Sequence, residues 1–197
     1  MSERTPIIGP DVDYQHATYI HPTACLYGNI KLAEGVNIWA NVVIRSEMGE
    51  TTIGKMTNIQ DFVMIHGGGV KIGANCSITH HCTIHLAEIG DNCLIGINST
   101  IMDGAVIGDN CTVAGGSFVT ENTIIPPNSI VMGAPAKARR QQNNYVANKL
   151  NAWMYYHNGL AYSRGDHRIW DSKEFQAESQ AMRATLEAEY TSLFGED

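Results

Sequence analysis

Residues 88–113 read EIGDNCLIGINSTIMDGAVIGDNCTV, and the spacing of this stretch decides the fold. An aliphatic side chain returns at every sixth position, at Ile89, Ile95, Ile101, Ile107 and Val113. A period of six is a multiple of the strand period of two and does not fit the 3.6 residues of a helical turn. Gly directly follows several of these aliphatic residues, as in Ile89-Gly90. The stretch therefore predicts short strands joined by tight turns.

The same spacing runs outward from this stretch in both directions. It covers residues 20–131, with changes of spacing after Ile44, Ile65 and Ile84. The further aliphatic positions are Ile20, Leu26, Leu32, Ile38, Ile44, Ile53, Ile59, Ile65, Ile72, Ile78, Ile84, Val119, Ile125 and Val131. A strand-and-turn unit repeated this often predicts a parallel β-helix whose aliphatic side chains stack along the axis.

The hexapeptide repeat resembles that of left-handed parallel β-helices, in which three hexads complete one triangular coil. The resemblance implies a mainly β fold in which residues about 18 positions apart stack on one face at roughly the 4.8 Å strand spacing. Cys76, Cys93 and Cys111 would then form one internal column, with Cys82 in the same place on another face. We interpret these thiols as small apolar packing groups.

Composition excludes several classes of function. The chain has 197 residues, 5 cysteines and a formal net charge of −7, and an acidic balance disfavours a nucleic-acid partner. No apolar run approaches the roughly 20 residues that span a bilayer, so no membrane contact is expected. The segment from Met1 to Pro6 lacks the apolar core of a signal peptide. We therefore expect a cytoplasmic protein with reduced cysteines.

A change of composition divides the chain into a β-helix domain, residues 1–135, and a C-terminal α-helical extension, residues 136–197. The first part carries the whole net negative charge, whereas the second balances acidic and basic side chains. The extension predicts one helix over about residues 138–157 and a second helix capped by Asp171, with Glu174 three positions later. Their apolar stripes are Val146, Leu150, Trp153, Met154 and His157, then Phe175, Met182, Leu186, Tyr190 and Leu193. We expect the helices to cover a flank of the β-helix or of a neighbouring subunit.

Two histidines predict half of a metal site. His66 follows Ile65, and His85 follows Ile84 one coil later on the same face, so both imidazoles point outward side by side. Parallel imidazoles about 5 Å apart can share one divalent metal, because each nitrogen needs to lie only about 2.0–2.1 Å from it. The plainer alternative is a chance cluster of surface histidines on a repetitive scaffold.

His80 lies near a corner of the triangular coil and should point away from the face that carries His66 and His85. In a threefold oligomer, the corner of one subunit docks on the face of the next, and His80 then joins the pair of a neighbour. Three neutral imidazoles leave a fourth zinc position open, as in catalytic sites. His81 is expected not to be a ligand.

Several runs resemble the γ-class carbonic anhydrases over about residues 10–140. They are Arg45-Ser46-Glu47, NIQDFVMIH at residues 58–66, His80 to His85 with four residues between, Ile101 to Gly108, and Gly133 to Lys137. Gly96-Ile97-Asn98, before Met102-Asp103-Gly104, resembles the branch that contains the carnitine-operon and phenylacetate-degradation proteins.

The resemblance implies a homotrimer with metal at its interfaces, bound by His66 and His85 of one chain and His80 of another. It also implies that Gln60 orients the metal-bound water and that Arg45 and Asp61 form an interface ion pair, which would fix the register of the subunits. Asn98 completes the expected catalytic set.

The sequence departs from the family pattern near the expected site. Ser46-Glu47 replaces the usual Gly-Asp after the arginine, Thr79 replaces a Gly before His80, and Leu86-Ala87 replaces Gly-Cys after His85. The loop after His66, residues 67–71, lacks the acidic residue that serves as a proton shuttle in better-studied members.

The segment between the two predicted helices, residues 155–170, is rich in aromatic and hydrogen-bonding side chains. We expect Tyr156, Tyr162 or Arg164 to reach a cleft of the trimer and to recognise a substrate larger than carbon dioxide.

Four functions remain open. The first is hydration of carbon dioxide by a hydroxide whose formation the metal favours by lowering the pKa of bound water toward about 7. The second is hydrolysis of a thioester or other acyl compound on the same site. The third is CoA-dependent acyl transfer with a histidine base and no metal, and the fourth is a non-enzymatic scaffold. Zinc is the expected metal, and iron and cobalt are compatible with three imidazoles.

Overall fold

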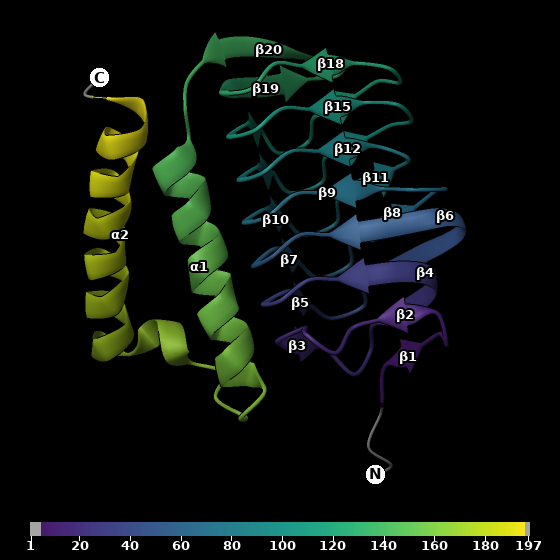
Figure 1. Ribbon diagram of the computed structural model, residues 1–197, viewed down its shortest axis with the longest axis horizontal. Coiled ribbons are helices and arrows are strands. Elements are labelled where there is room, and N and C mark those ends of the chain that lie inside the picture. Colours follow the sequence, from purple (N-terminus) through teal and green to yellow (C-terminus); the bar gives the residue numbers. More distant parts are fainter. Residues whose placement is uncertain (1–4, 196–197) are drawn as a thin grey trace.

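The computed structural model describes residues 5–195 and shows a parallel β-helix with a helical extension along one side (Figure 1). The chain winds in triangular coils, and three stacks of short parallel strands form the faces. The predicted fold class is confirmed, and the reason is the hexad itself: a two-residue strand and a turn leave one aliphatic side chain per hexad pointing inward.

The first face carries the two stacked histidines. Its strands are β1 (Ile7–Ile8), β4 (Cys25–Leu32), β6 (Val43–Ile53), β8 (Met64–His66), β11 (Thr83–His85), β14 (Thr100–Ile101) and β17 (Phe118–Val119). The strands β4 and β6 are long enough to bend around a corner, so their second halves belong to the third face.

The second face runs beneath the C-terminal helices. Its strands are β3 (Tyr19–Ile20), β5 (Asn37–Ile38), β7 (Asn58–Ile59), β10 (Ser77–Ile78), β13 (Leu94–Ile95), β16 (Thr112–Val113), β19 (Ser129–Gly133) and β20 (Ala136–Gln141). The third face adds β2 (Val12–Asp13), β9 (Lys71–Ile72), β12 (Glu88–Ile89), β15 (Val106–Ile107) and β18 (Ile124–Ile125).

The core is a set of aliphatic columns. Ile38 pairs with Ile59, which pairs with Ile78, and the same register continues through the coils above. These side chains are buried, and each buried aliphatic side chain contributes about 1.5–3 kcal/mol. Because an inward-pointing aliphatic residue recurs in every coil, a shift of one residue would turn these side chains outward, and the repeat therefore favours the observed register.

The expected cysteine column is present. Cys76, Cys93 and Cys111 are buried, and the Cys93 N–H donates to Cys76 Sγ at 3.3 Å. A hydrogen bond with Cys93 and burial raise the pKa of the Cys111 thiol. The Cys111 thiol is therefore protonated, and all three buried cysteines act as packing groups.

The turns from the second face to the first form one corner, which we call the histidine corner. It consists of residues 39–42, 60–63, 79–82, 96–99 and 114–117, one turn from each of five successive coils. Each turn places one residue in the left-handed region of backbone space, and these residues are Asn41, Phe62, His81, Asn98 and Gly116. Asn and Gly tolerate this conformation well, whereas Phe and His adopt it at a cost.

The C-terminal extension differs from its prediction at both ends of the first helix. Residues 136–141 form the strand β20, antiparallel to β19, and the helix α1 spans Tyr145–Tyr162 rather than residues 138–157. Ala, Arg and Gln favour helix in isolation, but the last coil of the β-helix offers an open strand edge, and pairing with that edge prevails.

The second helix, α2 (Lys173–Phe194), begins one residue later than predicted. Ser172, not Asp171, is its N-cap and accepts a hydrogen bond from the Phe175 N–H. Asp171 instead ends the short 3-10 helix η1 (Ile169–Asp171). Glu174 lies in the first turn, as expected.

Helix α1 covers the second face and α2 packs against the outer side of α1 (Figure 1). Asn148 of α1 is buried and donates to the carbonyl oxygens of Asn92 and Cys111, both at 3.0 Å. A Cβ at Gly159 would lie 3.2 Å from Asn37 Cβ, so glycine allows the close approach. No helix among residues 5–195 is long and apolar enough to cross a membrane.

Candidate metal centre

His66 and His85 lie side by side on the first face, in register between β8 and β11. Their ring centroids are 5.1 Å apart, at the spacing predicted from the repeat. The rings are not parallel, because an interplanar angle of 62° turns one edge toward the other. As a result, His66 Nδ1 and His85 Nε2 face each other at 3.1 Å.

Asp103 orients His85 from the next coil. Its Oδ1 lies 2.5 Å from His85 Nδ1, so this nitrogen carries the proton and Nε2 is left as the basic nitrogen. Carboxylates that hold the second ring nitrogen in this way are typical partners of metal-ligating histidines. The sequence prediction did not assign this role to Asp103.

Arg45 and Glu47 contact the other side of His66. Arg45 Nη2 lies 2.9 Å from His66 Nε2, and Glu47 Oε2 lies 3.4 Å from the same nitrogen. Since a guanidinium only donates, this contact assigns His66 Nε2 as an acceptor and the proton to Nδ1. That proton then lies between the two histidines, at the place that a divalent cation would take.

His80 lies on the histidine corner and is oriented by a carboxylate of its own. Asp61 Oδ2 is 3.0 Å from His80 Nδ1, and Asp61 Oδ1 also accepts a hydrogen bond from the Ala40 N–H. This contact assigns the proton to Nδ1 and leaves His80 Nε2 with a free lone pair. Within this chain Asp61 contacts His80, whereas Arg45 contacts His66 and Glu47.

Gln60 is buried beside Asp61 and belongs to a chain of hydrogen bonds that reaches α1. Its Nε2 donates to Asn58 Oδ1, Asn58 Nδ2 donates to Ser77 Oγ, and Ser77 Oγ donates to Asn151 Oδ1, over 2.8–2.9 Å. The chain fixes the orientation of the Gln60 amide, and its carbonyl oxygen is left to accept a further hydrogen bond. Sequence patterns alone gave no sign of this link to the C-terminal helix.

Asn98 lies one coil above His80, is exposed, and donates its backbone N–H to the His80 carbonyl oxygen at 3.0 Å. Among the residues predicted to bind substrate, Tyr162 packs against Trp39 with ring centroids 4.8 Å apart. Tyr156 contacts His157, and Arg164 is exposed just beyond the end of α1.

A further tyrosine of α1 also contacts the histidine corner. Tyr155 packs against Trp39 with centroids 5.8 Å apart, and burial together with the charge of Asp61 raises the pKa of Tyr155 to about 12. Burial and Asp61 also act on Tyr19 of the same cluster, whose pKa is raised. An aromatic wall formed by Tyr19, Trp39, Tyr155 and Tyr162 therefore borders the corner that carries His80.

The three candidate ligands do not form one cluster within a single chain. Among residues 5–195, no group of three His, Cys, Asp or Glu side chains could hold a metal ion. His66 and His85 lie on the first face, whereas His80 lies on the corner, as the spacing of the repeat predicts. A site that combined all three histidines would require a second copy of the chain.

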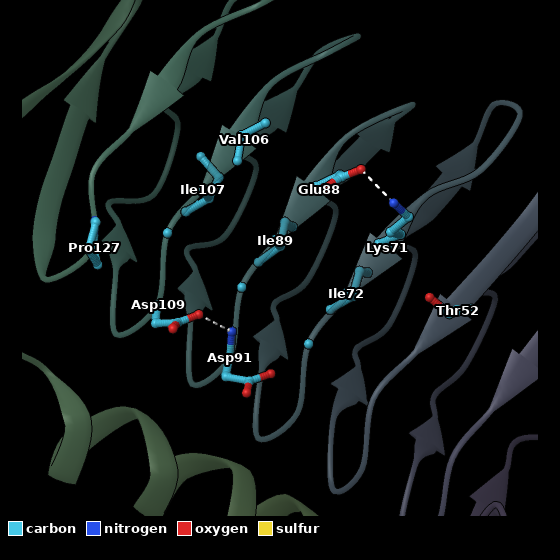
Figure 2. A pocket seen from close by; sticks show the side chains of 13 residues that line it. Thr52, Lys71, Ile72, Glu88, Ile89, Asp91, Val106, Ile107, Asp109 and Pro127 are labelled. Carbon is cyan, nitrogen blue, oxygen red and sulfur yellow. Dashed lines mark hydrogen bonds and ion pairs between the residues drawn. The ribbon is translucent and has the colours of Figure 1, made fainter. Parts of the chain in front are cut away.

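A shallow groove of about 560 Å³ lies elsewhere, on the third face (Figure 2). Lys71 and Glu88 form an ion pair at one side of it, and Asp91 and Asp109 lie at the turns below (Figure 2). Asp109 Oδ1 accepts the Asp91 N–H at 2.8 Å, so these carboxylates stabilise the turns. The groove contains no histidine and is separate from the candidate metal centre.

Comparison with known proteins gives consistent relatives. A family model described as bacterial transferase hexapeptide (six repeats) matches residues 87–121. The chain is 35% identical to the carnitine operon protein CaiE of Escherichia coli (strain K12) over 138 residues, which cover 68% of this chain and 67% of that protein. It is 26% identical to the mitochondrial gamma carbonic anhydrase 2 of Arabidopsis thaliana, over 98% of this chain and 71% of that protein.

Solved structures share the fold. A hexapeptide transferase family protein from Anaplasma phagocytophilum is 30% identical, with a TM-score of 0.70 over 84% of this chain and 99% of that one. A putative acetyltransferase from Bacillus cereus is 28% identical, with a TM-score of 0.71 over 82% of this chain and 94% of that one.

Proposed function

The chain belongs to the carbonic-anhydrase-like hexapeptide-repeat family that includes the carnitine operon protein CaiE, and on this premise we propose that it is a metal-dependent enzyme that hydrates carbon dioxide reversibly to bicarbonate. One observation carries the proposal: His66 Nδ1 and His85 Nε2 face each other at 3.1 Å, and Asp103 fixes the proton of His85. The metal-free acyltransferases of this fold need one histidine base, which gives no reason for a facing pair.

The donor set fits a divalent cation. Two ligands of a tetrahedral zinc site lie about 3.3 Å apart when each is about 2.05 Å from the ion, and the two facing nitrogens are already near that separation. Three imidazoles with carboxylates behind two of them suit zinc, and they are compatible with iron or cobalt. When bound, such a cation supplies the Lewis acidity that makes water nucleophilic near neutral pH.

Each residue around the candidate metal centre has a separate role in this proposal. Asp103 and Asp61 hold the Nδ1 protons of His85 and His80, which keeps the Nε2 atoms available. Gln60, oriented by Asn58, accepts a hydrogen bond from the nucleophilic water and aims it at the substrate carbon. Asn98 lies beside the same corner and is available to contact the product.

Glu47 of β6 places a second carboxylate beside the stacked histidines, 3.4 Å from His66 Nε2. The loop after His66 has no acidic side chain. Glu47, from the preceding coil, supplies the carboxylate near His66 instead. Arg45 holds Glu47 through a contact of 3.6 Å.

We propose further that the active protein is a homotrimer. The complete ligand set combines His66 and His85 of one subunit with His80 of the next, because one chain places these groups on different surfaces. Threefold symmetry repeats the same contact three times with one interface, which is the simplest closed arrangement that does so. The Arg45 and Asp61 side chains then meet across that interface.

Hydrolysis of an acyl thioester is the second candidate. The observation that favours it is the aromatic wall beside the histidine corner, which offers apolar surface that carbon dioxide does not need. The ligands and the nucleophile are the same in both candidates.

The test uses purified protein loaded separately with zinc, iron(II) and cobalt. Stopped-flow hydration of carbon dioxide is measured beside hydrolysis of a panel of acyl-CoA thioesters. We expect one metal per chain and hydration that disappears in His85→Ala and persists in His16→Ala, an exposed histidine outside the site. Thioester hydrolysis without hydration would establish the second candidate, and full activity in metal-free protein would refute both.

A further inference from the structure

The histidine corner carries two large rings where its neighbouring coils carry small residues. Phe62 and His81 occupy the left-handed position of their turns, with φ of 61° and 59°. The same position holds Asn41 and Asn98 in the flanking coils and Gly116 in the coil above. The two rings are stacked, with centroids 4.9 Å apart and an interplanar angle of 4°.

This arrangement is unfavourable within one chain on two grounds. Most residues with a Cβ are strained in the left-handed region, whereas Gly has no Cβ and Asn is tolerated because its short polar side chain can hydrogen-bond locally. Asn or Gly occupies the three equivalent positions. Phe62 is also 53% exposed, so its ring gains little from burial. Mutual stacking covers only one face of each ring. Backbone strain of this kind is maintained where something outside the local fold compensates for it.

The position of the two rings indicates what compensates. Phe62 follows Asp61, and His81 follows His80. The stacked rings therefore adjoin His80, the candidate ligand that would bind the metal of a neighbouring subunit. Phe62 lies in the same coil as His66, and His81 lies in the same coil as His85. Under threefold symmetry about an axis along the β-helix, equivalent coils of neighbouring subunits lie at the same level.

We propose that the Phe62–His81 stack is a docking wedge that inserts into the first face of a second copy of this chain and thereby positions His80 beside that copy's histidine pair. The inference rests on the proposed trimeric metal site and assigns positioning residues to it. The first face offers apolar surface at the same level, because Leu86, directly after His85, is 37% exposed and Met64, in the strand of His66, is partly exposed. Burial of the rings between subunits compensates for the strain.

The wedge also explains why the rings are stiff. Their parallel stacking and their fixed backbone leave few side-chain conformations, so little entropy is lost when the surfaces meet. His80, held by Asp61 beside the wedge, then approaches the neighbouring subunit in one orientation. Affinity for the metal is thus linked to the contact between subunits.

The test compares Phe62→Asn/His81→Asn with the unchanged full-length protein. Because Asn suits the left-handed position, we expect the chain itself to unfold at an equal or higher temperature. Sedimentation velocity across a dilution series should show a trimer dissociation constant raised at least about tenfold, since the lost contact is apolar and central. The zinc dissociation constant, measured by competition with a chromophoric chelator, should rise in parallel.

Met56→Asn is the matched control. Met56 also adopts the left-handed conformation, with φ of 60°, but it lies at the corner between the third and second faces. The same change of residue type there should affect unfolding in the same direction and leave trimer formation and zinc affinity unchanged.

Three results would overturn the proposal. One is an unchanged trimer and unchanged zinc affinity in the double variant. Another is an equal loss in Met56→Asn, which would mean that Asn at any corner disturbs the fold. The third is an intact trimer and metal site with a raised KM for acyl thioesters, which would make the stack a substrate platform. A wild-type chain that binds no metal would instead refute the proposed function. Comparing the trimer dissociation constants of the wild type and the double variant would still test whether the stack docks on a second copy.

Discussion

Two aspartates decide which nitrogens of the candidate centre are free. Asp103 contacts Nδ1 of His85, and Asp61 contacts Nδ1 of His80. Each carboxylate comes from a turn one coil away from its histidine. A neutral imidazole that donates from Nδ1 presents Nε2 as a lone pair. Both candidate ligands are therefore already held in the tautomer that a metal site at these histidines would need.

Asp103→Asn should weaken zinc binding by about 10–100-fold, the usual effect of removing such a partner. The amide oxygen can still accept the hydrogen bond from His85 Nδ1, but it carries no charge, so it holds this tautomer less strongly and no longer balances the charge of a bound cation. Equilibrium competition with a chelator measures the effect. Asp109→Asn, on the third face, removes a turn carboxylate of the same kind and should leave zinc affinity unchanged. Equal affinities of the two variants would exclude a role for Asp103.

The histidines of the site could be predicted from the sequence, whereas their partners could not. The repeat places His66 and His85 in one column because spacing along the chain determines which residues stack. It does not determine the direction of a side chain. In the register of the next coil, Met102 is the residue that lies opposite His85. Asp103 follows Met102, and its side-chain conformation directs the carboxylate toward His85 Nδ1. Glu47 likewise lies in an outward loop of β6, where the hexad spacing is interrupted.

At the level of elements, the strands of the β-helix lie where the hexad spacing predicts them. The start of the C-terminal extension differs from the helix that its amino-acid composition predicts. The aliphatic columns of all three faces match the hexad spacing, since a strand in this fold interacts with the equivalent residues of the next coil. Residues 136–141 have the composition of a helix, but they meet the open edge of β19. That edge is a property of the folded β-helix and has no signature within residues 136–141.

The contact between α1 and α2 contains a titratable group. His157 of α1 packs between Trp153, with centroids 4.2 Å apart, and Phe175 of α2, with centroids 6.1 Å apart. Burial lowers the pKa of His157, Glu178 opposes the shift, and Arg164 adds to it. The imidazole is therefore neutral in the packed interface at neutral pH.

Acidification should loosen this helical layer. Because the pKa of His157 is lower in the folded chain than its ordinary value of 6.5, the unfolded chain binds the proton first as the pH falls. The free energy of unfolding should then decrease as the pH drops from neutral through 6.5 toward the lowered pKa. Urea denaturation at several pH values measures this slope, which should be shallower in His157→Gln. An identical slope in that variant would show that His157 does not contribute.

At the scale of the whole molecule, the three faces have different tasks. The second face is covered by α1, the third carries ion pairs and turn carboxylates, and the first presents the paired histidines to the outside. The histidine corner projects between the covered face and the open one. A threefold arrangement brings the open face and the corner together while α1 stays outside the contact.

Mixed trimers can show directly that the site is shared. His80→Ala chains keep the paired histidines, and His66→Ala/His85→Ala chains keep the corner histidine, so neither homotrimer should bind zinc tightly. When the two are coexpressed in equal amounts, about a quarter of the interfaces join an intact pair to an intact His80, by random assortment in a closed threefold ring. Zinc per chain, measured by atomic absorption, should therefore recover to about a quarter of the wild-type value. A coexpressed sample that stays at the level of the separate variants would mean that the site does not combine His66 and His85 of one subunit with His80 of another.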